Sequence, residues 1–472
     1  MKALLPALLA AALLATAASA QPAPITLVEN GPRAERINVA VVAEGYREAD
    51  LDAFQAAAGR LIDALFATAP YDRYAAFFNA YAVPTVSAEA GADRPARSEA
   101  RDTYLSATFG CGGVHRSLCL GGDGERRLNA LLRDALPEYD VALVLVNDAE
   151  YGGSGGRVAV VSAHAAAAEI AVHEMGHTLA GLADEYGGGA AAGFASRNTA
   201  TDAHPAHVPW SAWLDDATPL PTPDDAAHGH VVGAFEGAAY ADHGAYRPER
   251  HCRMRALGHG FCAVCNEHHI GAIYDRVSPI AAAWPAESDV TAGAGRLAFR
   301  VDALVPAGQA RYEWTVDGVT VGTSAALALD AGDLPPGASH VEVRVTDATD
   351  EVRDSTLVPL LSDVRAWTVT RPAATAAESG AGGADTATRL GLAAPNPVRH
   401  AARLPFRLAE GGAVRLSVYD ALGREVAVLV DGERPAGLHE ATWSAGALAA
   451  GVYVVRLEAP GATATQVVTV AR

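Results

Sequence analysis

Two histidines and a glutamate lie close together in the segment His173-Glu174-Met175-Gly176-His177. On a helix, residues four apart share one face, so both imidazoles can bind one metal ion. Glu174 lies beside them and can take a proton from a metal-activated water and pass it to a leaving amine. The spacing predicts a zinc hydrolase site with His173 and His177 as ligands and Glu174 as the general base. The alternative is two surface histidines on an alanine-rich helix.

A catalytic zinc ion needs a third protein ligand and an open position for water. Gly181 is suited to end the helix, and a tight turn there would bring Asp184 back towards the metal. We therefore predict Asp184 as the third ligand. Glu185 is the nearest competitor and Glu236 is a more distant one. Asp184 could otherwise bond a histidine N–H from outside the ligand set.

The elements around this segment follow a strand–loop–helix order. Residues 141–146 are six consecutive apolar residues, which is typical of a strand buried on both faces. A glycine-rich loop at 151–156 precedes a short strand at 158–161 and an alanine-rich helix from about His164 to Ala180. We predict that the short strand is the sheet edge along which an extended substrate lies. The loop lacks the Gly-Lys-Ser/Thr ending of a phosphate loop, which excludes nucleotide binding of that kind.

The 472 residues are too many for one ordinary core, and the sequence divides into five parts. Residues 1–20 have the positive start, apolar run and small-residue cleavage site of a signal peptide. Residues 21–285 alternate strand and helix patterns and form the predicted catalytic α/β domain. Alternating strands and turn signals at 286–371 predict an immunoglobulin-like β-sandwich. A small, polar linker at 372–392 leads to a second all-β domain at 393–472.

The formal net charge is −19, which makes the chain a poor partner for nucleic acid or an anionic membrane, because phosphate contacts require clustered Lys and Arg; we predict no nucleic-acid partner. No stretch after the signal peptide is long and apolar enough to span a membrane. We expect a soluble monomer outside the cytoplasm that acts on protein or peptide substrates.

The chain has five cysteines, Cys111, Cys119, Cys252, Cys262 and Cys265. An exported protein meets an oxidising compartment, so disulfide pairing is the default. The first two are predicted to close a short loop. One of the other three must stay free, bind metal or pair elsewhere, and we favour a disulfide between Cys252 and one of its neighbours. The spacing of Cys262 and Cys265 also suits a second zinc site that includes Cys252 and His268.

Further motifs accompany the metal helix at 36–38, 44–46, 145–148, 151–156, 181–186, 236–240, 246–248, 252–255 and 261–265. Together they resemble the bacterial IgA-peptidase family of zinc metallopeptidases, over about residues 25–275. The resemblance implies a zinc endopeptidase related to the metzincins, with a zincin-like α/β fold. Metzincins usually place a third histidine ten residues after the first, where this chain has Ala183. That departure supports an acidic third ligand.

The resemblance also implies roles for a methionine and a tyrosine. Metzincin-like enzymes place a methionine turn beneath the zinc, and Met254 is the best match; ordinary core packing is the alternative. Tyr246 or Tyr240 could donate a hydrogen bond to the oxyanion of the tetrahedral intermediate, and we predict Tyr246. A structural role for this tyrosine is the alternative.

The C-terminal region carries an ordered set of motifs at 394–397, 416–420, 423–426, 436–439 and 451–453. They resemble the C-terminal sorting domain of the type IX secretion system, over about residues 393–472. The resemblance implies this secretion machinery as a partner, and release or attachment of the enzyme at the cell surface. A carbohydrate-binding or adhesive sandwich is the alternative.

These observations predict a secreted zinc metalloendopeptidase that hydrolyses peptide bonds in extracellular proteins through a zinc-activated water. A zinc amidase acting on cell-wall peptides would use the same ligands. A non-catalytic surface adhesin is the alternative from another class, but a pure binding module would not need Glu174.

Overall fold

The computed structural model describes residues 21–189, 193–293, 295–372, 387–394, 396–398, 400–446 and 448–471. The predicted signal peptide and most of the predicted linker at 372–392 lie outside the described residues. The chain forms two compact units. Unit 1 extends to Val277 and includes Glu351–Leu357, and unit 2 takes the remaining residues.

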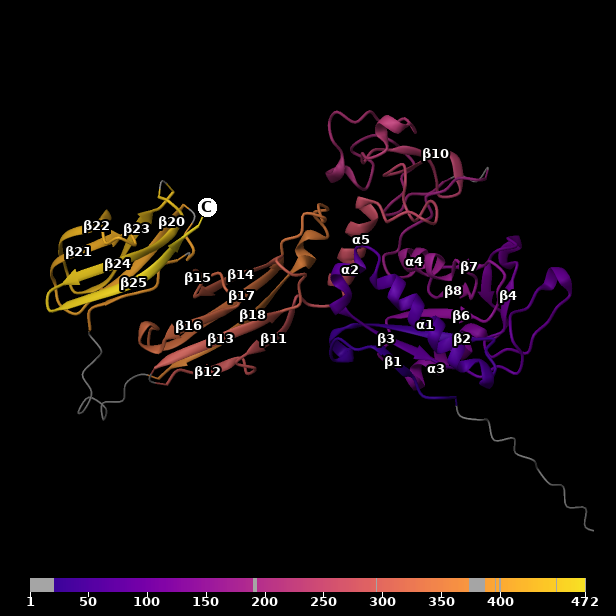
Figure 1. Ribbon diagram of the computed structural model, residues 1–472, viewed down its shortest axis with the longest axis horizontal. Coiled ribbons are helices and arrows are strands. Elements are labelled where there is room, and N and C mark those ends of the chain that lie inside the picture. Colours follow the sequence, from indigo (N-terminus) through magenta and orange to yellow (C-terminus); the bar gives the residue numbers. More distant parts are fainter. Residues whose placement is uncertain are drawn as a thin grey trace, which may run out of the picture. The chain divides into compact units, whose positions relative to one another are not determined.

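Unit 1 is built on a six-stranded sheet in the order β1-β3-β2-β6-β8-β7 (Figure 1). Strands β2, β3, β6 and β8 are parallel, and antiparallel β1 and β7 form the two edges. Two further hairpins pair β4 with β5 and β9 with β10. The strands are β1 (Ile25–Val28), β2 (Ile37–Glu44), β3 (Phe78–Val83), β4 (Ala107–Phe109), β5 (Leu118–Leu120), β6 (Val141–Val146), β7 (Gly153–Ser154), β8 (Ala159–Ser162), β9 (Phe235–Ala238) and β10 (Ala241–Arg247).

Helices pack against this sheet and against one another. The α-helices of unit 1 are α1 (Leu51–Phe66), α2 (Tyr71–Tyr74), α3 (Gly124–Ala135), α4 (Ala167–Thr178) and α5 (Ala263–Tyr274). Ala40 of β2 and Val144 of β6 share a buried core with Leu128 and Leu132 of α3. Helix α4 contacts β7, β8 and α1. Burial of β2 and β6 along their whole length agrees with their continuous apolar sequences.

The strand–loop–helix order predicted around the histidines is present. The strand predicted at 141–146 is β6, and the helix predicted at about 164–180 is α4. The short strand is β8, but it is not the edge of the sheet, so that prediction is wrong. Antiparallel β7 covers its outer side, with Gly153 opposite Val161 and Ser154 opposite Val160. The glycine loop therefore supplies the edge strand itself.

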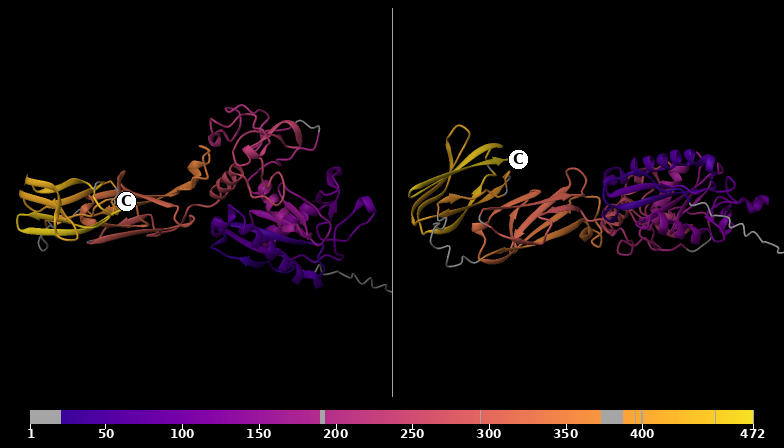
Figure 2. Two further views of the ribbon diagram at one scale, coloured as in Figure 1. Left: turned by 45° about the horizontal axis from the view of Figure 1, so that its top comes forward. Right: turned by 90° about the horizontal axis from the view of Figure 1, so that it is seen from below.

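Unit 2 consists of β-sheets, so the chain has an N-terminal mixed α/β region followed by β-rich domains. Figure 2 shows these domains, coloured orange to yellow, as strands without an α-helix in the described residues. In the first domain, sheets β11-β13-β16 and β12-β18-β17-β14-β15 enclose a core with Phe299, Trp314 and Trp367. The strands are β11 (Ile280–Trp284), β12 (Asp289–Thr291), β13 (Arg296–Ala303), β14 (Ala310–Val316), β15 (Val319–Gly322), β16 (Ala326–Asp330), β17 (Gly337–Asp347) and β18 (Ser362–Arg371).

The second domain of unit 2 has sheets β19-β20-β23 and β22-β21-β24-β25. Phe406, Leu416, Trp443 and Leu457 lie in their shared core. Buried and exposed residues alternate along β20, as expected for a strand with one face on a core. The strands are β19 (Arg389–Leu390), β20 (Ala401–Leu408), β21 (Gly412–Tyr419), β22 (Glu425–Arg434), β23 (Gly437–Ser444), β24 (Gly451–Ala459) and β25 (Ala462–Val470).

Unit 1 ends at Val277, before the predicted boundary at residue 285. It also includes the later loop Glu351–Leu357, which lies in the sequence between strands of the first β-domain. The buried Glu267 of α5 accepts hydrogen bonds from the backbone N–H groups of Arg353 and Asp354. Arg73 forms an ion pair with Glu351 in the same loop. Residues 351–357, which the sequence places in the sandwich, therefore belong with unit 1.

Candidate active site

Helix α4 carries three of the predicted site residues and ends in a turn that returns the chain to them. The N–H of Gly181 bonds the carbonyl of His177 at 3.1 Å, and Gly181 has a φ of +64°. This is a helix end in which the left-handed position favours glycine because no Cβ obstructs it. The turn directs the following residues, including Asp184, back towards the face of α4 that carries His173.

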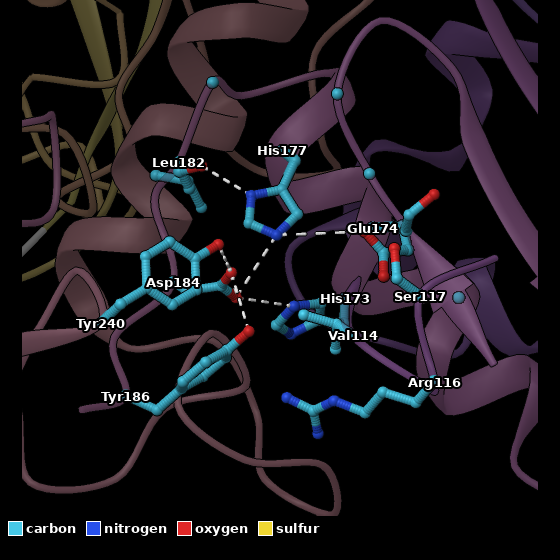
Figure 3. Close-up of a pocket in the computed structure, with 15 residues that line it drawn as sticks. Val114, Arg116, Ser117, His173, Glu174, His177, Leu182, Asp184, Tyr186 and Tyr240 are labelled. Atoms are coloured by element: carbon cyan, nitrogen blue, oxygen red, sulfur yellow. Dashed lines mark hydrogen bonds and ion pairs between the residues drawn. The ribbon is translucent and has the colours of Figure 1, made fainter. Parts of the chain in front are cut away.

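Three ligand atoms converge at this face. Asp184 Oδ1 lies 3.1 Å from His173 Nε2 and 3.4 Å from His177 Nε2 (Figure 3). Within the described residues, Asp184 Oδ1 is buried and has no hydrogen-bond partner in favourable geometry. Two imidazole nitrogens and a carboxylate oxygen facing one point fit a metal ion with three protein ligands.

Backbone carbonyls hold both imidazole rings in the form that metal binding needs. His173 Nδ1 lies 2.9 Å from the Arg253 carbonyl, and His177 Nδ1 lies 2.8 Å from the Leu182 carbonyl. A carbonyl oxygen only accepts hydrogen bonds, so each Nδ1 carries the proton and donates it. In the neutral rings each Nε2 then presents a lone pair to the convergence point. Such outer contacts orient metal-binding histidines and fix their tautomer.

Two tyrosines hold the other oxygen of Asp184. The Tyr186 and Tyr240 hydroxyls donate to Asp184 Oδ2 at 3.0 and 2.5 Å. Tyr240 lies at the turn between β9 and β10, where Ala239 and Tyr240 have φ values of +49° and +64°. Non-glycine residues rarely adopt this conformation, and such strain is typical of functional sites. The strained turn points the Tyr240 side chain into the site (Figure 3).

The charges of the metal-free site are strongly coupled. Burial would raise the pKa of Asp184, but the two imidazoles hold that pKa well below its ordinary value. Burial opposes a charge on His177, but Asp184 raises its pKa to about 9. The pKa of His173 is raised for the same reason, against the effect of burial. Before a metal binds, His177 therefore carries a proton at neutral pH and forms an ion pair with Asp184.

Zinc binding to the metal-free protein is expected to release protons at pH 7. Only the neutral imidazole binds metal, so zinc must displace the proton that Asp184 stabilises on His177. The release should diminish as the pH rises through about 9, the pKa of His177. Titration calorimetry in buffers of different ionisation enthalpy measures it. The His173→Ala/His177→Ala variant serves as the blank for zinc bound elsewhere, and an equal release from both proteins would contradict the expectation.

Glu174 lies on the same helix with its carboxylate facing the glycine loop. Its side chain is buried, and Oε2 lies 3.9 Å from His177 Nε2 without a hydrogen-bond partner in the described residues. Burial raises the pKa of Glu174. A Cβ on Gly155 would lie 2.2 Å from Glu174 Oε2, so glycine is required there. A buried carboxylate of raised pKa, with no hydrogen-bond partner for Oε2 in the described residues, is well placed beside a metal-ligand set to accept and return a proton.

Met254 lies directly beneath α4. It is fully buried, and a Cβ on Gly176 would lie 2.5 Å from its sulfur. Its carbonyl accepts the N–H of Glu185 at 2.8 Å, while the preceding carbonyl of Arg253 holds His173. The segment around Met254 thus supports both the helix and the turn that carry the candidate ligands.

The structure distinguishes between the candidates that the sequence left open. Glu185 turns away from the two histidines into a separate buried cluster with cysteines. Glu236 has an exposed side chain that accepts from the Gly244 N–H. Tyr246 does not line the cavity, whereas Tyr240 does. Tyr246 instead forms a backbone bridge with Ala200.

An open cavity of about 540 Å³ lies in front of the ligand atoms. The ligand residues line it together with Arg116, Tyr186 and residues 153–156 of the glycine-rich loop. Arg116 extends along one side of the cavity (Figure 3) and lies over the Tyr186 ring at 5.8 Å. Sequence reasoning missed Arg116 and Tyr186. The only local signal was that Arg116 falls inside the loop between Cys111 and Cys119.

Tyr240→Phe is expected to weaken metal binding or turnover by about 10- to 100-fold, the effect typical of removing a group that orients a metal ligand. The substitution deletes the short hydrogen bond to Asp184 Oδ2 and keeps the ring. Zinc affinity and peptide hydrolysis would both be measured. Tyr246→Phe is the matched control, since the structure leaves that side chain outside the cavity. Loss of turnover in Tyr246→Phe alone would restore the sequence-based choice.

The cysteines fall into two groups. Cys111 and Cys119 form the predicted disulfide. Cys252, Cys262 and Cys265 are buried with free thiols, so the structure does not form the disulfide predicted for Cys252. His268 is not part of their cluster, whose fourth member is Glu185.

Unit 1 thus has a mixed sheet and a helix whose candidate metal ligands face an open cavity, an arrangement that suits a metal-dependent hydrolase. The family model described as IgA Peptidase M64 matches residues 25–228 and 224–273, more than half of the chain. The chain therefore belongs to the M64 IgA peptidase family. This membership implies metallopeptidase activity and a protein substrate. No helix in the described part of the chain is long and apolar enough to cross a membrane.

Comparisons with individual proteins are weaker. No curated protein sequence matches the chain. Among solved structures, dimeric latent PorU from Porphyromonas gingivalis matches with 15% identity and a TM-score of 0.19, over 40% of this chain and 20% of that chain. Bacteroides uniformis beta-glucuronidase 3 matches with 11% identity and a TM-score of 0.15, over 49% of this chain and 28% of that one. This chain thus spans about a fifth of PorU, and scores this low support no argument about fold or function.

Proposed function

We propose that this protein is a zinc-dependent endopeptidase that hydrolyses peptide bonds in extracellular proteins. One observation carries the proposal. The Nε2 atoms of His173 and His177 and the Oδ1 atom of Asp184 converge in the wall of an open cavity, beside the buried carboxylate of Glu174. Two imidazoles and one carboxylate suit zinc, and a three-ligand set leaves a position open for catalysis.

The residues of this chain have distinct roles in the proposed reaction. Zinc held by the three ligands supplies Lewis acidity to the attacking water and the scissile carbonyl. Glu174 accepts a proton from the water while the oxygen of the water forms a bond to the carbonyl carbon. Glu174 then delivers this proton to the amide nitrogen as the C–N bond breaks. Its buried position raises its pKa, which helps it to hold the proton between the two steps.

The cavity offers backbone as well as side chains to a substrate. Val114, Arg116 and Ser117 line one part of it, and the glycine loop 153–156 lines another. Glycines leave main-chain N–H and C=O groups open to close approach, so an extended peptide can pair with them whatever its side chains are. We propose that substrate lies against this loop with the scissile bond facing Glu174.

Export by the type IX system belongs to the same proposal. It rests on the signal-like residues 1–20 and on the ordered motifs within 393–472. Deletion of residues 393–472 is expected to retain the enzyme inside a cell that has this machinery, because the sorting signal is lost. Immunoblots of medium and cell fractions measure it. Unchanged release into the medium would show that the domain has another role.

Metal removal and restoration test the central proposal. The purified full chain is expected to hydrolyse casein, to lose this activity on chelation and to recover it with added zinc. Peptidoglycan fragments assayed in parallel test the amidase alternative. Hydrolysis of cell-wall peptides without casein cleavage would overturn the endopeptidase assignment. If chelation has no effect on casein cleavage, the proposal that the activity depends on a metal ion is overturned.

A further inference from the structure

A second group of metal-ligating side chains lies behind the active site and takes no part in the proposed reaction. Glu185, Cys252, Cys262 and Cys265 bring one carboxylate oxygen and three sulfurs within 4.8 Å of one another. All four residues are buried, and three of them are fully inaccessible to solvent. From this cluster we infer that the protein binds a second, structural zinc ion through three thiolates and the Glu185 carboxylate.

The distances fit a tetrahedral metal site. The sulfurs of Cys252 and Cys265 are 3.6 Å apart. Zinc with Zn–S bonds of about 2.3 Å separates two ligand sulfurs by ~3.8 Å. Glu185 Oε1 lies 3.1 Å from the Cys265 sulfur and 4.0 Å from the Cys262 sulfur. A zinc ion therefore requires only small movements of these atoms.

The local backbone favours thiolates. Cys262 caps the N-terminus of α5, and its sulfur accepts the Cys265 N–H at 3.4 Å. The Cys262 N–H in turn points to the Cys252 sulfur at 3.4 Å. Helix N-termini and N–H donors stabilise negative sulfur. A Cys-x-x-Cys pair at this position, completed by ligands from elsewhere in the chain, is a spacing common in structural zinc sites.

The buried carboxylate is the second reason to place a cation here. In the described part of the chain, no basic side chain lies within ion-pair distance of Glu185, and its Oε2 atom has no hydrogen-bond partner. Oε1 accepts from Asn198 at 2.9 Å. A buried carboxylate without a countercharge is unfavourable, and a metal ion removes this cost.

A disulfide is the competing account of the three cysteines, because the protein is expected to be exported. A disulfide places its sulfurs about 2.05 Å apart, well short of the 3.6 Å between Cys252 and Cys265. Pairing these two would also leave a buried thiol on Cys262 beside the buried Glu185. The metal satisfies all four groups at once.

The cluster is joined to the active site through adjacent residues. Glu185 follows the ligand Asp184 in the chain, and Cys252 precedes the segment whose Arg253 carbonyl holds His173. The N–H of Glu185 also bonds the Met254 carbonyl. A second zinc would thus fix the two segments that position the catalytic ligands, so its ligands are positioning residues.

Metal analysis of the purified full chain tests the inference. Wild type is expected to contain two zinc ions per chain. The His173→Ala/His177→Ala variant should retain one, because it keeps the cysteine cluster. In that variant, cobalt substituted for zinc should show the near-ultraviolet charge-transfer absorption of cobalt–thiolate bonds. Absence of this absorption from a variant that binds cobalt would overturn the inference.

Cysteine variants supply the matched comparison. Cys262→Ser/Cys265→Ser should lose one zinc relative to wild type, whereas Cys111→Ser/Cys119→Ser, which removes the same number of sulfurs, should keep both. If the first variant fails to fold, alkylation of denatured, unreduced wild type decides the matter. Three labelled cysteines per chain support the site, and one labelled cysteine shows a disulfide and overturns it.

The two metal proposals fail in different ways. If wild type contains only one zinc and the His173→Ala/His177→Ala variant keeps it, the peptidase proposal is removed and the second site stands. If wild type contains only one zinc and the His173→Ala/His177→Ala variant loses it, while Cys252, Cys262 and Cys265 stay reactive, the second site is removed and the peptidase proposal stands.

Discussion

Replacing Glu174 with glutamine is expected to lower kcat for casein hydrolysis by about 100- to 10,000-fold, the contribution of a general acid–base group. The amide fills the same space beside Gly155 but cannot accept a proton from water. Glu174 is not among the three converging ligand residues, so zinc content should remain that of wild type. Retained zinc with lost turnover separates proton transfer from metal binding.

Glu125→Gln is the matched control for this substitution. Glu125 lies exposed in the first turn of α3 and does not line the active-site cavity, so the same change of charge should leave kcat unaltered. A Glu174→Gln protein with full activity would remove the residue from the mechanism. A protein that loses zinc as well would place Glu174 among the groups that hold the metal.

The parts of the site that the sequence predicts are close together in the chain. His173 and His177 share one helical face by spacing alone, Glu174 lies beside them, and Gly181 signals the turn that returns Asp184 to them. All of these residues fall within one helix and the loop that follows. Local rules of helix geometry and helix ending were therefore sufficient to predict how these residues lie. Strand β6, which precedes the helix, was recognisable from its six consecutive apolar residues.

The parts that sequence reasoning missed depend on long-range contacts or on unfavourable local conformations. Tyr240 was named only as the alternative to Tyr246 for a contact with the oxyanion, and its contact with Asp184 was missed, because it is made from a turn in which two non-glycine residues have positive φ. Nothing in the sequence indicated that Glu185 is buried with cysteines from two segments that lie far away in the chain. Because an exported protein is expected to meet an oxidising compartment, we predicted a disulfide for Cys252 instead. Residues 351–357 join unit 1 through contacts with Arg73 and Glu267 that lie far away in the sequence.

Asp184→Asn is expected to weaken zinc binding at the active site by more than about 100-fold and to abolish hydrolysis at ordinary zinc concentrations. Loss of an outer group already costs 10- to 100-fold, and a direct ligand should cost more. The amide keeps the shape of the side chain but removes the charge that faces both histidines. In the metal-free protein it also removes the group that raises the pKa of His177 to about 9. Calorimetric zinc titration and activity at increasing zinc concentrations measure both effects.

Glu185→Gln distinguishes the two neighbouring carboxylates. If Asp184 is the third catalytic ligand, Glu185→Gln should retain the zinc that depends on His173 and His177, and should affect only the zinc at the cysteine cluster. The opposite pattern, with active-site zinc lost in Glu185→Gln and kept in Asp184→Asn, would reverse the assignment. The structure favours the first result because Asp184 Oδ1 faces both histidines, whereas Glu185 Oε1 lies 3.1 Å from the Cys265 sulfur. Consecutive residues thus direct their carboxylates to two different sites, so each substitution serves as the other's control.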